Sequence, residues 1–215
     1  MSFVGGVGYS NIDLIYSGLD RLPDKGEEIF ARGFSMQFGG GIPATMINLS
    51  RLGVESRIIT FAGHDLFSEF VKKTLNSYPV KTVNLYKGNK MPVVLSSTLL
   101  YCGDRSFISY TDGMDLNDAV MDEVYENLKG AYVVDMHVGF LDVYKRLKKD
   151  GCIQIFDTGW EDDLTLEKYK DYLEIADYYI PNQKEAMKIT GTSSVEEAAD
   201  ILSEFFSDRS EEHTS

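Results

Sequence analysis

Gly39-Gly40-Gly41-Ile42-Pro43 marks the point at which an extended segment runs into a helix. Three successive glycines remove every Cβ atom, so the backbone can turn sharply and lie directly against a ligand. Pro43 has a φ angle that suits a first helical turn, and the N–H that it lacks would have no partner there. The same residues are typical of a tight turn that lets a helix pack close to a strand. The glycines alone do not distinguish the two.

The helix after this turn is predicted over residues 44–52. Its apolar face carries Met46, Leu49 and Leu52, and Gly53 ends it. A helix N-terminus behind bare backbone offers N–H groups to a polar or anionic ligand. The sequence therefore marks this turn as a candidate binding site.

Apolar strands and amphipathic helices alternate through the rest of the chain. Strands are predicted over residues 3–9, 56–62, 131–136, 152–156 and 178–180, and helices over 65–77, 117–128, 140–149, 165–176, from 181 onward and over 195–206. Because helices separate the strands, the sequence predicts an α/β fold with a doubly wound, mostly parallel sheet.

Two segments interrupt this alternation, an extended arm over 29–38 and a hairpin over 92–110 that turns at Gly103. We expect them to form a small second sheet that covers the site, with lid segments at about 14–38 and 92–110. A chain of 215 residues suits one α/β domain, here 1–206, followed by a polar tail over 207–215.

Composition excludes several classes of partner. The chain has 43% hydrophobic and 12% aromatic residues, which is typical of a globular protein. Its net charge of −13 argues against nucleic acid as a partner. Cys102 and Cys152 are too few for a disulfide framework or a thiolate metal site. Without a signal-peptide pattern or an apolar run of membrane-spanning length, the sequence predicts a cytoplasmic protein with no membrane partner.

Asn11 and Asp13 lie two residues apart where the first predicted strand ends. An extended backbone points both side chains to one face, and ligands bind at the carboxyl ends of parallel strands. An ionised aspartate accepts hydrogen bonds from hydroxyl groups, as a polyol-binding site requires. The alternative is an Asx turn that ends the strand.

Pro181-Asn182-Gln183-Lys184-Glu185 likewise has a structural and a ligand-binding interpretation. Asn182 and Glu185 form a capping-box pattern that needs no ligand. They also place an amide and a carboxylate beside a phosphate or its hydrated Mg²⁺, and Asp157 faces the same rim. His64 and His137 lack metal-ligand spacing, and their residue pattern alone favours structural roles.

Gly6-Val7-Gly8 begins like a dinucleotide-binding fingerprint, but the third glycine would fall at Asn11 and no helical pattern follows. We therefore reject a Rossmann cofactor site at these glycines.

Taken in order, the motifs resemble the PfkB (ribokinase-like) carbohydrate kinases. They are a strand followed by Asn-x-Asp, an extended arm, a Gly-Gly-Gly turn before a helix that ends Ser-Arg-Leu-Gly, a Gly-x-Asp at Gly63, and a late Pro-Asn-x-x-Glu. The resemblance runs from about residue 3 to 206.

The resemblance implies an α/β sandwich with a β-lid, which transfers the γ-phosphoryl group of Mg-ATP to a sugar or nucleoside hydroxyl. Asn11 and Asp13 would then bind substrate hydroxyls, with residues 39–41 along the substrate. Asn182 and Glu185 would order phosphate and Mg²⁺, Glu185 through water, and Asp157 would lie on the cofactor side. The lid would exclude water, and the family resemblance leaves room for a homodimer through the lid. Dependence on a monovalent cation stays open.

Two positions depart from the family pattern. Ala44 stands where the signature helix usually has a sugar-contacting Asn, and His137 stands where ribokinases tend to have a sugar-contacting Glu. We therefore expect His137 on the substrate side and do not assign plain ribose as the substrate.

The Gly-Ala-Gly-Asp run that supplies the family's anion hole and catalytic base does not occur in the 215 residues. We expect this chain to be inactive as it stands, with no catalytic residue of its own. A non-catalytic sugar- or nucleoside-binding protein is the alternative. The last seven residues resemble a translated sequencing adapter, which suggests a gene model cut short; an ordinary polar C-terminus is the alternative.

Overall fold

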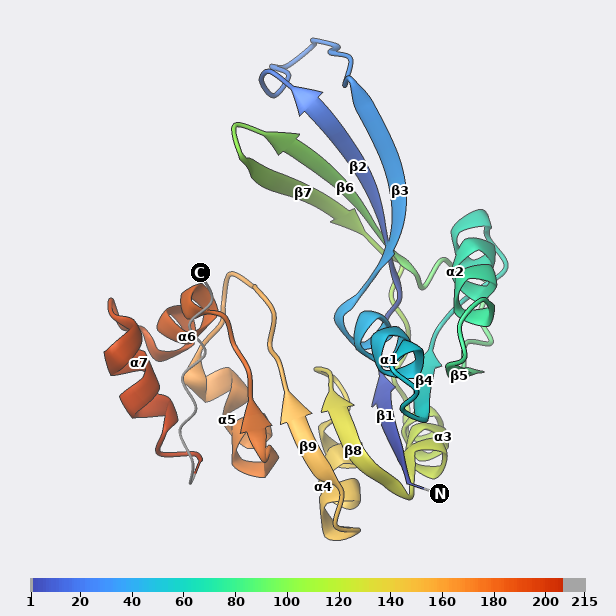
Figure 1. The fold of residues 1–215 in the computed structure, drawn as a ribbon, viewed down its shortest axis with the longest axis vertical. Helices are drawn as coiled ribbons and strands as arrows, with labels where there is room; N and C mark the ends of the chain where they lie inside the picture. The colour runs from blue at the N-terminus through green and yellow to red at the C-terminus, as the bar shows by residue number, and fades with distance from the viewer. Residues whose placement is uncertain (1, 207–215) are drawn as a thin grey trace.

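The computed structural model describes residues 2–206, so the predicted tail at 207–215 lies outside the described residues. Its larger sheet has six parallel strands and is flanked by helices (Figure 1). The strand order is β10 (Tyr178–Tyr179), β9 (Ile153–Phe156), β8 (Ala131–Met136), β1 (Phe3–Val7), β4 (Ser56–Thr60) and β5 (Lys81–Asn84). The predicted doubly wound parallel sheet is confirmed.

Seven helices lie within residues 2–206, and the last two follow the final strand. They are α1 (Gly41–Arg51), α2 (Leu66–Asn76), α3 (Asp118–Leu128), α4 (Leu141–Lys149), α5 (Leu166–Ile175), α6 (Gln183–Thr190) and α7 (Val195–Leu202). The predicted last helix was too long, because α7 ends at Leu202 and the chain continues in turns to Phe206. No helix among the described residues is both long enough and apolar enough to span a bilayer.

A second sheet, which we call the lid sheet, lies above the larger one in the view of Figure 1. Its strand order is β3 (Gly33–Gly39), β2 (Asn11–Leu19), β6 (Val94–Tyr101) and β7 (Asp104–Tyr110). The expected small β-lid is therefore present. Strand β2 corrects the sequence analysis, since Asn11 and Asp13 do not end the first strand but begin a lid strand four residues after Val7.

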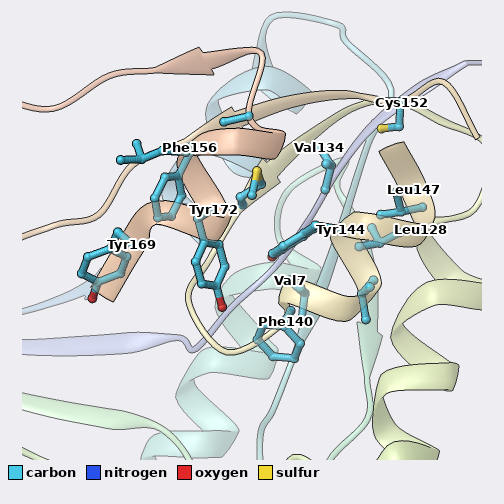
Figure 2. Close-up of a cluster of buried hydrophobic side chains, with 14 of the residues drawn as sticks. Val7, Leu128, Val134, Phe140, Tyr144, Leu147, Cys152, Phe156, Tyr169 and Tyr172 are labelled. Atoms are coloured by element: carbon cyan, nitrogen blue, oxygen red, sulfur yellow. The ribbon is translucent and has the colours of Figure 1, made fainter. Parts of the chain in front are cut away.

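Two apolar clusters cover the two faces of the larger sheet. The first includes residues of α3, α4 and α5, and Figure 2 shows its aromatic centre. The second includes α1 and α2 residues together with Ile12 and Ile58. Tyr144 and Phe156 in the first cluster are fully buried, so the side of the sheet beneath the candidate site is rigidly packed.

Helix α1 begins earlier than predicted, at Gly41, and packs with a different face. Its buried residues are Ile42, Pro43, Met46, Ile47 and Ser50, whereas Leu52 is 80% exposed. Of the predicted apolar face, Met46 is buried and Leu49 packs against the second cluster, but Leu52 lies beyond the end of α1 and faces away from the core.

Close contact between α1 and β1 depends on the absence of two side chains. A Cβ atom added to Gly6 would lie 2.5 Å from Ile42 Cγ2, and one added to Gly8 would lie 2.8 Å from Ile42 Cγ1. Real Cβ contacts are not this short, so both glycines leave room for Ile42 to reach the sheet. Gly6-Val7-Gly8 thus has a packing role here.

Candidate functional site

Asn11 and Asp13 point to the same face of the lid sheet, which we call the inner face. Asn11 Nδ2 donates a hydrogen bond to Asp13 Oδ1 at 2.9 Å. Ser96 Oγ on β6 donates to Asn11 Oδ1 at 3.3 Å, and Ser96 and Ser109 share a hydrogen bond of 2.7 Å. Because Asn11 and Asp13 lie within β2, the Asx-turn alternative is wrong.

Asp13 keeps its second carboxylate oxygen beside bare backbone. A Cβ atom on Gly39 would lie 2.6 Å from Asp13 Oδ2, so any other residue at this position of β3 would displace the carboxylate. Burial raises the pKa of Asp13, and the hydrogen bond from Asn11 lowers it, with a net upward shift. The pair therefore presents a half-buried acceptor to a ligand under the lid.

The two roles predicted for the turn, a tight bend and an open backbone, fall on Gly40 and Gly41 respectively. Gly40 is the N-cap of α1, has φ +100° and would place a Cβ atom 2.8 Å from the Tyr9 carbonyl oxygen. Gly41 has nothing within 4 Å of its Cβ position, and Ala44 on the next turn is exposed. Gly40 thus makes the tight turn, and Gly41 leaves the surface of the helix start open.

Asp135 on β8 is a candidate site residue that the sequence analysis missed. Its pKa is raised to about 6, mainly by burial and to a smaller extent by the charge of Asp157, although a hydrogen bond with Thr45 on α1 lowers it. A carboxylate inside the otherwise apolar strand 131–136 was the available signal. Asp135 and Asp157 therefore lie close enough to repel each other electrostatically.

His137 follows β8 and lies near the α1 side of the site. Its Nδ1 is 2.8 Å from the Val138 carbonyl oxygen, an acceptor, so Nδ1 carries the proton. Burial lowers the pKa of His137. The imidazole contacts the Tyr9 ring edge-on at 5.8 Å between centroids, and its Cδ2 lies 3.6 Å from the Cβ position of Gly8.

Asn182 and Glu185 form the predicted capping box at the start of α6. Glu185 N–H donates to Asn182 Oδ1 and Asn182 N–H donates to Glu185 Oε2, both at 3.0 Å. The charges of Glu185 and Asp157 both raise the pKa of Tyr179, although burial is the larger cause. The structure thus gathers Asp157 and Glu185 around Tyr179.

These residues fit a hydrated Mg²⁺ ion. The cap uses Glu185 Oε2 and leaves Oε1 without a hydrogen bond, and Mg²⁺ commonly keeps several water ligands. Among residues 2–206, no three His, Cys, Asp or Glu side chains form a metal-binding group.

Asp157 lies between Asp135 on one side of the site and Tyr179 on the other. It interacts with Asp135 on the neighbouring strand and with Tyr179 on the other side. The sheet order β10-β9-β8-β1 places these residues along one edge, at the carboxyl ends of parallel strands. A continuous polar rim therefore runs from α6 to His137.

Comparison with known proteins matches this arrangement. The model of the pfkB family carbohydrate kinases covers residues 1–212. A Pyrococcus horikoshii protein named as a sugar kinase is 35% identical over 92 residues, which is 40% of this chain and 30% of the relative. The match thus spans about a third of that curated relative.

Ribokinase structures share the fold. The Arabidopsis thaliana enzyme, complexed with ribose and ATP, has a TM-score of 0.74 at 22% identity over 96% of this chain and 70% of its own. The Giardia lamblia ribokinase has a TM-score of 0.78 at 18% identity over 95% of this chain and 66% of its own. By the family match, this chain belongs to the pfkB family of carbohydrate kinases.

Proposed function

We propose that this chain carries the sugar-binding part of an ATP-dependent kinase that phosphorylates a hydroxyl of a sugar or nucleoside. The observation that carries the proposal is the Asn11–Asp13 pair on the inner face of the lid sheet, with Asp13 Oδ2 beside the bare backbone of Gly39. A carboxylate in this position accepts hydrogen bonds from neighbouring hydroxyl groups. Membership of the pfkB family and the ribose complex of the Arabidopsis fold relative support it.

The α6 end of the rim would serve the phosphate side. Asn182, Glu185 and Asp157 are the residues that would meet ATP phosphates and Mg²⁺, with Glu185 acting through a bound water. Mg²⁺ would neutralise charge on the transferring phosphoryl group. The lid sheet would exclude water so that the sugar hydroxyl is the acceptor.

The 215-residue chain is expected to bind a sugar without consuming ATP, because the Gly-Ala-Gly-Asp run is absent from its sequence. Calorimetric titration with D-ribose, D-fructose and adenosine, with and without Mg-ATP, measures binding. A coupled assay for ADP measures turnover in the same samples. Sugar-dependent ADP release would contradict the expected inactivity, and a lack of binding by all three probes would weigh against the sugar site.

A non-catalytic sugar- or nucleoside-binding protein is the second candidate, favoured by the same missing run. Sequencing the native locus past codon 206 separates the two. A continuing frame that encodes Gly-Ala-Gly-Asp supports the kinase, whereas a stop codon after Ser215 supports the binding protein.

The resemblance to ribokinase-like kinases leaves room for a homodimer through the lid, and we further propose that the outer face of the lid sheet, opposite Asp13, joins the two copies. Met36, Leu14, Ser97 and Ile108 lie in one row of this face. Met36 is 41% exposed and Ile108 is 69% exposed, which is typical of an apolar surface that another molecule covers.

Ile108→Asp is expected to convert the dimer to a monomer, because it places a charge in this row. Light scattering coupled to size exclusion measures the mass. Phe107→Asp is the matched control, since Phe107 pairs with Thr98 on the inner face and is also exposed. A wild-type monomer at all concentrations, or equal dimerisation of both variants, would contradict the interface.

A further inference from the structure

Two buried tyrosines accept hydrogen bonds from the backbone of the loop between β8 and α4. His137 N–H donates to the Tyr144 hydroxyl oxygen at 2.8 Å. Gly139 N–H donates to the Tyr172 hydroxyl oxygen, also at 2.8 Å. Tyr144 is on α4 and Tyr172 is on α5, and Figure 2 shows the two rings side by side in the core.

These two hydroxyl groups satisfy backbone donors that no side-chain cap serves. Phe140, the N-cap residue of α4, makes no side-chain capping bond. A buried N–H group without an acceptor costs stability and loosens its loop. Burial raises the pKa of both tyrosines, so the phenols stay protonated and neutral across the physiological range. The loop therefore has two fixed anchors within three residues.

The anchored loop sets the chemistry of the His137 ring. Nδ1–H is used by the Val138 carbonyl oxygen, and Nε2 has no hydrogen-bond partner among residues 2–206. Because burial lowers the pKa of His137, the ring is neutral and Nε2 carries a free lone pair.

The groups around this ring are mostly uncharged. Tyr9 and Phe140 pack against it at 5.8 and 6.5 Å between centroids, and the Tyr144 hydroxyl lies beneath its backbone. Asp135 on β8 and Asp157 after β9 are the nearby acidic groups on this part of the sheet. Burial favours the neutral ring by lowering the pKa of His137, and the hydrogen bond with the Val138 carbonyl oxygen opposes this.

On the basis of the proposed sugar site, we propose that Tyr144 and Tyr172 are positioning residues that hold His137 as a neutral hydrogen-bond acceptor for a substrate hydroxyl. The acceptor is the Nε2 lone pair, because the Val138 carbonyl oxygen already uses Nδ1–H. It accepts one hydrogen bond without adding a negative charge beside Asp135. Protonation at low pH would turn this acceptor into a donor.

Tyr172→Phe tests the positioning role, and Tyr169→Phe is its matched control. Both residues are buried on α5, but the Tyr169 hydroxyl donates to Glu161 and does not reach the loop. Nitrogen-15 NMR of the histidine rings reports tautomer and pKa without any ligand. We expect the Nδ1–H form in the wild type and in Tyr169→Phe. Tyr172→Phe should show mixed tautomers and a higher His137 pKa, because its loosened loop admits water.

Tyr144→Phe provides a second variant that removes the other anchor and should change the same resonances. Unchanged His137 tautomer and pKa in both Tyr172→Phe and Tyr144→Phe would overturn the inference. A change of equal size in Tyr169→Phe would also overturn it, because a general loss of packing would then explain the effect.

Sugar affinity gives the functional readout. For whichever of D-ribose, D-fructose and adenosine binds the wild type, Tyr172→Phe should bind roughly fivefold more weakly at pH 8, the loss of about one hydrogen bond. Wild-type binding should fall as the pH drops through the His137 pKa, and this fall should begin at higher pH in Tyr172→Phe. Equal affinity and equal pH profiles would refute the substrate role of His137. If the wild type binds none of the three probes, the proposed function is contradicted. The NMR result still decides the positioning role.

Discussion

Replacing Asp13 with asparagine should weaken sugar binding roughly 100-fold, which corresponds to about 3 kcal/mol. Asn11 Nδ2 donates to Asp13 Oδ1, and Oδ2 beside Gly39 is the acceptor left for a substrate hydroxyl. Asparagine keeps the size but loses the charge, and one of its two amide positions becomes a donor. The affinity is measured by calorimetric titration at pH 8, where the wild-type carboxyl group is ionised.

Asp104→Asn is the control for this change. Asp104 is an exposed carboxylate on the same lid sheet, at the β6–β7 turn, and its side chain accepts only a local hydrogen bond from the Arg105 N–H. Its replacement should leave sugar affinity within a factor of two of the wild type. Binding by Asp13→Asn within about threefold of the wild type would show that this carboxylate does not contact the sugar.

Gly40→Ala should destabilise the fold by about 3 kcal/mol, the upper end for a residue forced into a glycine-only conformation. Gly40 has φ +100° and ψ 134°, and a Cβ atom would lie 2.8 Å from the Tyr9 carbonyl oxygen and 3.3 Å from the Pro43 ring. The backbone oxygen cannot move without disturbing the β1–β2 connection. Thermal unfolding should shift by roughly 6–12 °C for a domain of this size.

Gly41→Ala separates this effect from helix propensity. Gly41 is the first residue of α1, and its Cβ position has no atom within 4 Å. Alanine there should leave the melting temperature within about 2 °C of the wild type, or raise it slightly. Equal losses from both variants would mean that the turn tolerates no change anywhere, and the assignment of separate roles to Gly40 and Gly41 would fail.

Local patterns predicted those parts of the fold that local chemistry controls. The α6 capping box follows from the spacing of Asn182 and Glu185, and the structure has both of its hydrogen bonds. The parallel sheet follows from strands separated by amphipathic helices. The hairpin around Gly103 is likewise confirmed, with β6 and β7 paired on either side of it.

Contacts between distant segments could not be predicted in this way. The break between β1 and β2 is not marked by proline or by a charged turn, so the first strand was expected to run on to Asn11. Asp135 gains its significance from Thr45 and Asp157, which are far from it in sequence. The anchoring of His137 depends on Tyr172, which lies 35 positions later along the chain. Whether the predicted site residues bind a sugar and ATP stays a proposal.

The space between β1 and the start of α1 is too small for one methyl group at Gly6 or Gly8. Ile42 rests against both glycines and directly follows Gly41, so the depth at which it seats fixes how far the glycine turn stands from the sheet edge. A methyl group on Gly6 or Gly8 would push Ile42, and with it the start of α1, away from the sheet. The position of the glycine turn thus depends on apolar packing between Ile42 and the two glycines.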